Sequence, residues 1–76
     1  MAKAYLKINV LPGREKIIRS ALAEIKGVKS AYLTAGDQDI IAFVEADNFE
    51  NLVKLVLTKL RVIEGIIKSD TNLILE

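Results

Sequence analysis

The sequence contains the same helix-to-strand junction twice, as Ile25-Lys26-Gly27-Val28 and as Ile63-Glu64-Gly65-Ile66. At each junction an apolar residue that ends a helical pattern is followed by a glycine and then by an apolar residue that begins a strand pattern. Glycine commonly ends helices because it adopts the left-handed backbone conformation without a steric penalty. The repeat therefore predicts a chain built from two similar strand-helix-strand halves.

Hydrophobic periodicity predicts four strands, at residues 4–11, 28–35, 39–45 and 66–75. The first strand alternates apolar and polar residues until Pro12-Gly13 ends it. The third contains an apolar run on both of its faces, which indicates a central position in a sheet. Between the second and third strands, Gly36-Asp37-Gln38 predicts a tight hairpin turn.

Two further segments have apolar residues at helical spacing. The first begins at Arg14, and we predict that its whole apolar stripe is core. The second is predicted to begin after Asp47 as N-cap, because Glu50 follows at the spacing of a capping box. The stripes consist of Ile17, Ile18, Ala21, Leu22 and Ile25 in the first helix and of Phe49, Leu52, Val53, Val56, Leu57 and Leu60 in the second.

The order β-α-β-β-α-β predicts a single α+β domain over residues 1–76 with the ferredoxin-like fold, in which two helices cover one face of a four-stranded antiparallel sheet. The other face is then left uncovered. If Leu6, Ile8, Ile40, Ala42 and Val44 face the helices, the uncovered face carries Tyr5, Leu11, Ile41 and Phe43. Large exposed apolar patches usually mark interfaces, so we predict a dimer that packs sheet against sheet through these four residues.

Composition excludes several classes of function. The 76 residues include no cysteine and no histidine, which removes disulfides, thiolate nucleophiles and the commonest general base and metal ligand. We expect neither catalysis nor a metal or other cofactor. The eleven basic and ten acidic residues are interspersed, for a net charge of +1, so no direct nucleic-acid binding is expected. No apolar stretch is long enough to span a membrane, and a cytoplasmic protein is the expectation.

Two polar segments are candidate binding sites. Asp37 and Asp39 flank the hairpin turn, where aspartates most often hydrogen-bond their own backbone. Alternatively, an aspartate and free N–H groups of the turn bind the ammonium and carboxylate of a small zwitterion. Residues 69–72 form a polar patch in the last strand, which is typical either of an exposed sheet edge or of one wall of a ligand cleft.

The order of these segments resembles the ligand-binding (RAM) domain of the Lrp/AsnC transcription regulators. The resemblance extends over Val10–Glu15, Ile25–Leu33, Thr34–Ala42 and Val62–Leu75, and its most specific part is the Gly-Asp-x-Asp turn that enters an apolar strand. It implies a ferredoxin-like domain that dimerises through its sheets. It also implies assembly of dimers into rings, often octamers, with free amino acid effectors bound between dimers.

The resemblance also implies binding residues, because in the family the Gly-Asp-x-Asp turn and the last strand line the effector site. The matching positions in this sequence are Leu33, Thr34, Gly36, Asp37, Asp39 and Thr71. Gln38 stands where the family often has an aromatic residue. Full-length members have an N-terminal helix-turn-helix, whereas this chain begins at the first strand of the sensor domain, so we expect a stand-alone form.

Two functions remain open from the sequence. The first is an amino-acid-sensing, oligomerising domain that regulates transcription without a DNA-binding domain of its own, through a full-length Lrp/AsnC-type regulator or by sequestering the effector. The second is a ligand-independent oligomerisation adaptor that associates with such full-length regulators. The uncovered apolar sheet face is compatible with both.

Overall fold

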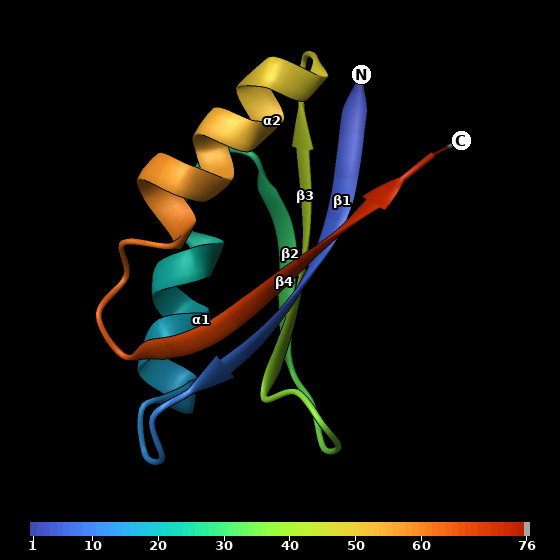
Figure 1. Cartoon of the computed structure of the whole chain (residues 1–76). Helices are drawn as coiled ribbons and strands as arrows, with labels where there is room; N and C mark the ends of the chain where they lie inside the picture. Colours follow the sequence, from blue (N-terminus) through green and yellow to red (C-terminus); the bar gives the residue numbers. More distant parts are fainter. Residues whose placement is uncertain (76) are drawn as a thin grey trace.

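A computed structural model describes residues 1–75, which form a four-stranded antiparallel sheet with the helices against one of its faces (Figure 1). The order of elements is the predicted β-α-β-β-α-β, so the ferredoxin-like fold is confirmed. The elements are β1 (Ala2–Val10), α1 (Glu15–Ala23), β2 (Val28–Leu33), β3 (Ile40–Ala46), α2 (Phe49–Leu55), the π-helical segment η1 (Val56–Leu60) that continues α2, and β4 (Ile66–Ile74).

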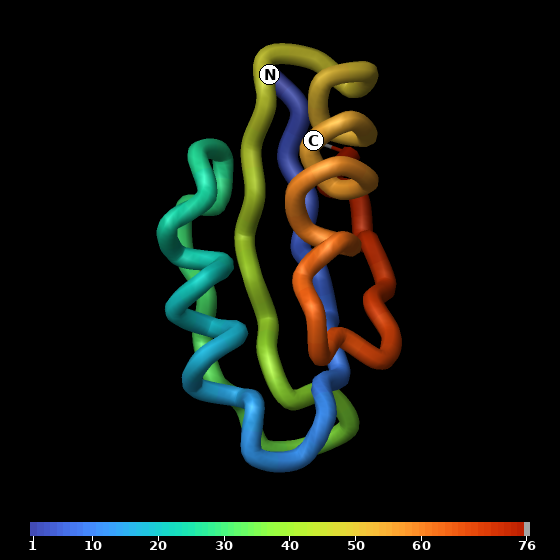
Figure 2. Tube along the Cα trace, turned by 90° about the vertical axis from the view of Figure 1, so that its left-hand side faces the viewer, coloured from blue at the N-terminus to red at the C-terminus, as the bar shows by residue number. Residues whose placement is uncertain are grey.

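The strands lie in the order β2-β3-β1-β4, so β1 and β3 are central and β2 and β4 are edges. Figure 2 shows that β1 begins and β4 ends at one end of the sheet, while the loop after β1 and the β2–β3 hairpin lie at the opposite end. Two segments that are far apart in the sequence therefore lie at the same end of the sheet. The predicted strand ends are within one residue of the observed ones, except that β1 begins at Ala2 and β2 ends at Leu33.

The hydrophobic core lies between the sheet and the helices. The prediction for the sheet is confirmed, since all five residues expected to face the helices are fully buried. The helices contribute Ile18 and Leu22 from α1, Leu52 from α2, and Val56 and Leu60 from η1. Full burial of one such side chain contributes roughly 1.5–3 kcal/mol of transfer free energy. No helix among residues 1–75 is long and apolar enough to cross a membrane.

The prediction that the whole first stripe is core is wrong at Ile17 and Ala21, which are exposed. The second stripe, in the helix formed by α2 and η1, is also only partly buried. Its apolar residues form two parallel lines, and only one line touches the sheet. Residues four apart lie above one another on a helix, so each line holds every fourth residue. The buried line is Leu52, Val56 and Leu60, and the exposed line is Phe49, Val53 and Leu57.

α2 begins one residue later than predicted. Its N-cap is Asn48, whose side-chain oxygen accepts a hydrogen bond from the Asn51 amide at 2.8 Å, and Asp47 does not fill this role. Both residue types are good N-caps. The spacing to Glu50 favoured Asp47, but the backbone becomes helical only at Phe49.

The face of the sheet that points away from the helices is uncovered in the single chain (Figure 1). On this outer face Tyr5 lies opposite Phe43, and their ring centroids are 5.2 Å apart. Tyr32 lies opposite Ile41 in the neighbouring strand pair. Leu11, by contrast, follows the end of β1, and its amide donates to the carbonyl of Gly65. The outer face thus presents three of the four predicted interface residues as one patch, together with Tyr32.

Candidate ligand-binding site

Residues 34–39 join β2 to β3 as a closed hairpin. The amide of Thr34 donates to the carbonyl of Asp39 at 2.9 Å, and the Thr34 hydroxyl donates to the carbonyl of Gln38 at 2.7 Å. Gly36 has a φ of 144°, a value that side-chain-bearing residues rarely adopt. The glycine of the Gly-Asp-x-Asp turn is therefore explained by backbone geometry.

Asp39 ties this hairpin to the neighbouring strand β1 through both its backbone and its side chain. Its amide donates to the carbonyl of Ile8 at 3.0 Å, and its carboxylate oxygen Oδ2 accepts from the Val10 amide at 2.9 Å. Asp39 thus bonds another strand, whereas the commoner behaviour of turn aspartates is to bond their own backbone. One carboxylate oxygen stabilises the fold, and the other oxygen is left for a further partner.

A hollow of about 420 Å³ lies between this hairpin and the loop that leads into α1, and we call it the hairpin hollow. Its volume falls within the roughly 300–1,000 Å³ of small-molecule sites. Its lining residues are Gly13, Glu15, Lys16, Leu33, Thr34 and Asp39. Three of the predicted binding residues, Leu33, Thr34 and Asp39, are therefore brought together.

The hairpin hollow contains charges of both signs. Lys16 is its cation, and Glu15 and Asp39 are its carboxylates. Glu15 also accepts a hydrogen bond from the Gly13 amide at 3.0 Å, which orders the loop before α1. A free amino acid can place its carboxylate on the lysine and its ammonium on a carboxylate, since charge-assisted hydrogen bonds are the stronger ones. Leu33 adds an apolar surface for a side chain.

The sequence analysis missed Gly13, Glu15 and Lys16. Topology could have identified them, because in a βαββαβ sheet the first loop and the central hairpin lie at the same end. Two predicted residues, Gly36 and Asp37, do not line the hollow and are exposed. The structural contact of Asp37 is made by its backbone carbonyl, which accepts from the Asn9 side chain at 2.8 Å.

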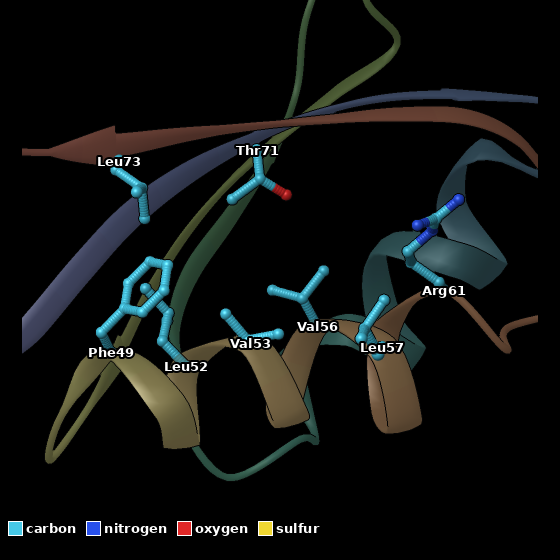
Figure 3. Close-up of a pocket in the computed structure, with 8 residues that line it drawn as sticks. All are labelled: Phe49, Leu52, Val53, Val56, Leu57, Arg61, Thr71 and Leu73. Carbon is cyan, nitrogen blue, oxygen red and sulfur yellow. The ribbon is translucent and has the colours of Figure 1, made fainter.

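The remaining predicted residue, Thr71, lies elsewhere in the chain. It pairs with Leu6 in the middle of β1 and lines a second depression, of about 270 Å³, between the helix and β4 (Figure 3). We call this depression the α2–β4 groove. In a single chain, therefore, three of the predicted binding residues line the hairpin hollow, Thr71 lines the α2–β4 groove, and Gly36 and Asp37 line neither.

Comparison with known proteins identifies one family. Residues 3–76 match the model of the Lrp/AsnC ligand binding domain. The uncharacterized HTH-type transcriptional regulator PF0250 of Pyrococcus furiosus is 38% identical over 52 residues, which are 68% of this chain and 35% of that protein. The chain thus spans about a third of the length of the curated relatives that it matches.

Solved structures agree with this match. The crystal structure of TTHA0845 from Thermus thermophilus has a TM-score of 0.94 at 26% identity, over 100% of this chain and 95% of that chain. The transcriptional regulator NMB0573 from Neisseria meningitidis, in complex with L-Met, has a TM-score of 0.87 at 13% identity, over 99% of this chain and 50% of that chain, which shows the fold alone. Since the family model covers nearly the whole chain, the protein belongs to the Lrp/AsnC ligand-binding domain family of transcription regulators.

Proposed function

We propose that this chain is an amino-acid-sensing, oligomerising domain that acts on transcription through effector binding and has no catalytic activity. The observation that supports this function is the hairpin hollow, whose lining includes the cation of Lys16 and the carboxylates of Glu15 and Asp39. Charges of both signs around one hollow match the two charged ends of a free amino acid. NMB0573, a protein of the same fold, has a crystal structure in complex with L-Met, which supports an amino acid as the ligand class.

We further propose that the chain forms dimers through its outer face and that dimers assemble into rings. The outer face supports a dimer because Tyr5, Ile41 and Phe43 form an apolar patch that no helix covers. In such a ring, an effector bound at the hairpin hollow would lie at the end of a sheet, where a neighbouring dimer can complete the site. Thr71 would join that site only if another protomer supplied it.

The sensing function predicts that one amino acid, or a few related ones, will raise the melting temperature. A ligand at about a hundred times its dissociation constant should stabilise the fold by roughly 2.7 kcal/mol. Lys16→Gln should abolish most of this stabilisation because it removes the charge that meets the ligand carboxylate. Asp39→Asn should do the same while keeping an oxygen for the Val10 amide. A thermal-melt panel against the twenty amino acids measures both effects.

The matched controls are Lys54→Gln and Asp47→Asn, which make the same chemical changes at exposed positions outside the hairpin hollow. Both should keep the ligand-induced shift. A shift that survives Lys16→Gln and Asp39→Asn would place the effector elsewhere and would contradict the hairpin hollow. A panel with no shift at all would contradict amino acid sensing.

The second candidate function is the ligand-independent adaptor, and the outer face is the observation that favours it. The patch formed by Tyr5, Tyr32, Ile41 and Phe43 can pack against the sheet of a full-length regulator without any bound effector. Co-expression with such a regulator tests this function. Co-purification that is unchanged by Lys16→Gln and Asp39→Asn, together with a flat amino acid panel, would support the adaptor.

A further inference from the structure

The α2–β4 groove is a second depression, separate from the hairpin hollow. It exists because the exposed apolar line of α2 and η1 does not reach the sheet and because β4 is an edge strand. Part of its floor is the π-helical segment η1, and π-helical turns occur frequently at functional sites. Its lining residues are Phe49, Leu52, Val53, Val56, Leu57, Arg61, Thr71 and Leu73.

The two polar side chains of the groove lie at its middle and at one end. Figure 3 shows Phe49 and Leu73 at one end and Arg61 at the other, with the Thr71 hydroxyl on the side toward Arg61. The remaining lining side chains are apolar. The groove therefore combines an apolar portion with a hydroxyl at its middle and a guanidinium at one end.

The charge of the groove is unbalanced. In the described part of the chain, residues 1–75, the one ion pair joins Lys68 to Asp70, so no carboxylate of these residues neutralises Arg61. None of the lining residues is acidic. A guanidinium binds both oxygens of a carboxylate in a planar fork, whereas nothing in the groove would accept a hydrogen bond from an ammonium as strongly as a carboxylate does.

We propose that the α2–β4 groove binds a small aliphatic monocarboxylate that has no amino group. Arg61 binds the carboxylate, and the Thr71 hydroxyl donates a second hydrogen bond to it. The alkyl chain lies along the helix against Val53 and reaches Phe49 and Leu73. The ligand differs from an amino acid by lacking the ammonium group. The hairpin hollow has carboxylates to bind an ammonium and the groove has none, so this site does not rest on the proposed sensing function.

Titration of the isotope-labelled chain with acetate, butyrate and hexanoate, followed by amide NMR signals, tests the site. Hexanoate should shift signals of α2, η1 and β4, and affinity should rise with chain length by up to about fourfold per buried methylene. Norleucine, which is hexanoate with an amino group on carbon 2, should bind the groove several-fold more weakly. The proposal would be overturned if the amide signals of the groove did not shift, or if the affinity did not depend on the length of the alkyl chain.

Matched variants separate the groove from general effects of a fatty acid. Arg61→Gln should weaken hexanoate binding about tenfold, since it removes a charge-assisted bond. Thr71→Val, which keeps the shape of the side chain, should weaken binding by a smaller factor. Arg19→Gln on α1 makes the same charge change outside the groove and should have no effect.

Two further results would overturn the site. Hexanoate binding that is unchanged in Arg61→Gln would show that the carboxylate is not held there. Signals of the groove that shift with protein concentration, without hexanoate, would show that a second copy of the chain covers it. Asp39→Asn should leave hexanoate binding intact, so a failure of the groove and a failure of the hairpin hollow can be distinguished.

Discussion

Replacing Gly27 by alanine is expected to destabilise the domain by about 3 kcal/mol, although the change adds a single methyl group. Gly27 has a φ of +102°, which costs an L-residue roughly 1–2 kcal/mol. An added Cβ would also lie 2.8 Å from the Leu55 side chain and 3.2 Å from the carbonyl oxygen of Glu45. The Glu45 backbone cannot easily yield, because its amide donates to the Gly27 carbonyl at 2.8 Å.

Denaturant unfolding at a fixed protein concentration measures this loss. Gly13→Ala is the matched control, because Gly13 has a φ of +88° but nothing within 4 Å of an added Cβ. We expect it to lose only the conformational part, about 1–2 kcal/mol. Gly65→Ala should fall between the two, since its Cβ would meet the flexible end of Ile18 at 2.8 Å. Equal losses at Gly27 and Gly13 would contradict the packing argument.

These two junction glycines, Gly27 and Gly65, also explain why the fold could be predicted from the sequence. Both have positive φ values at helix-to-strand junctions, so a requirement of the local backbone is recognisable in the sequence as a glycine. The alternation in β1 and β3 is equally local, because successive strand side chains point to opposite faces. Local backbone geometry and the periodicity of apolar residues are the properties that can best be predicted from a single sequence.

The positions that were predicted wrongly depend on contacts between elements. Helical spacing shows that Ile17 and Ile18 share one side of α1, but only packing against the sheet decides that Ile18 is buried and Ile17 exposed. Lys16 was not predicted for the same reason, since it lines the hairpin hollow together with Asp39, a residue on a different segment of the chain. Thr71 was assigned by resemblance to an effector site that the turn and the last strand line between dimers. In a single chain it lines the α2–β4 groove and not the hairpin hollow, so its assignment stays a prediction that depends on contacts between protomers.

Replacing Phe43 by aspartate is expected to convert the proposed dimer into a monomer. Phe43 lies on the outer face beside Tyr5, with the ring planes inclined at 45°, and it would be covered by the sheet of a second copy. A carboxylate without a partner in such an interface loses its hydration, which costs several kcal/mol. The dissociation constant of the dimer should therefore rise by about a hundredfold or more, because roughly 2.7 kcal/mol corresponds to that factor.

Light scattering coupled to size-exclusion chromatography measures the change as a fall from twice the 8.4 kDa chain mass, or a larger even multiple, to 8.4 kDa. Phe43→Leu keeps an apolar side chain and should remain associated. Val62→Asp introduces the same charge at a position that is 68% exposed and away from the outer face, so it should also remain associated. Because the core faces the helices, Phe43→Asp should keep its far-ultraviolet circular dichroism. A wild-type chain that is already monomeric at micromolar concentration would contradict the sheet-to-sheet dimer, whereas a folded Phe43→Asp chain that stays dimeric would place the interface on another surface.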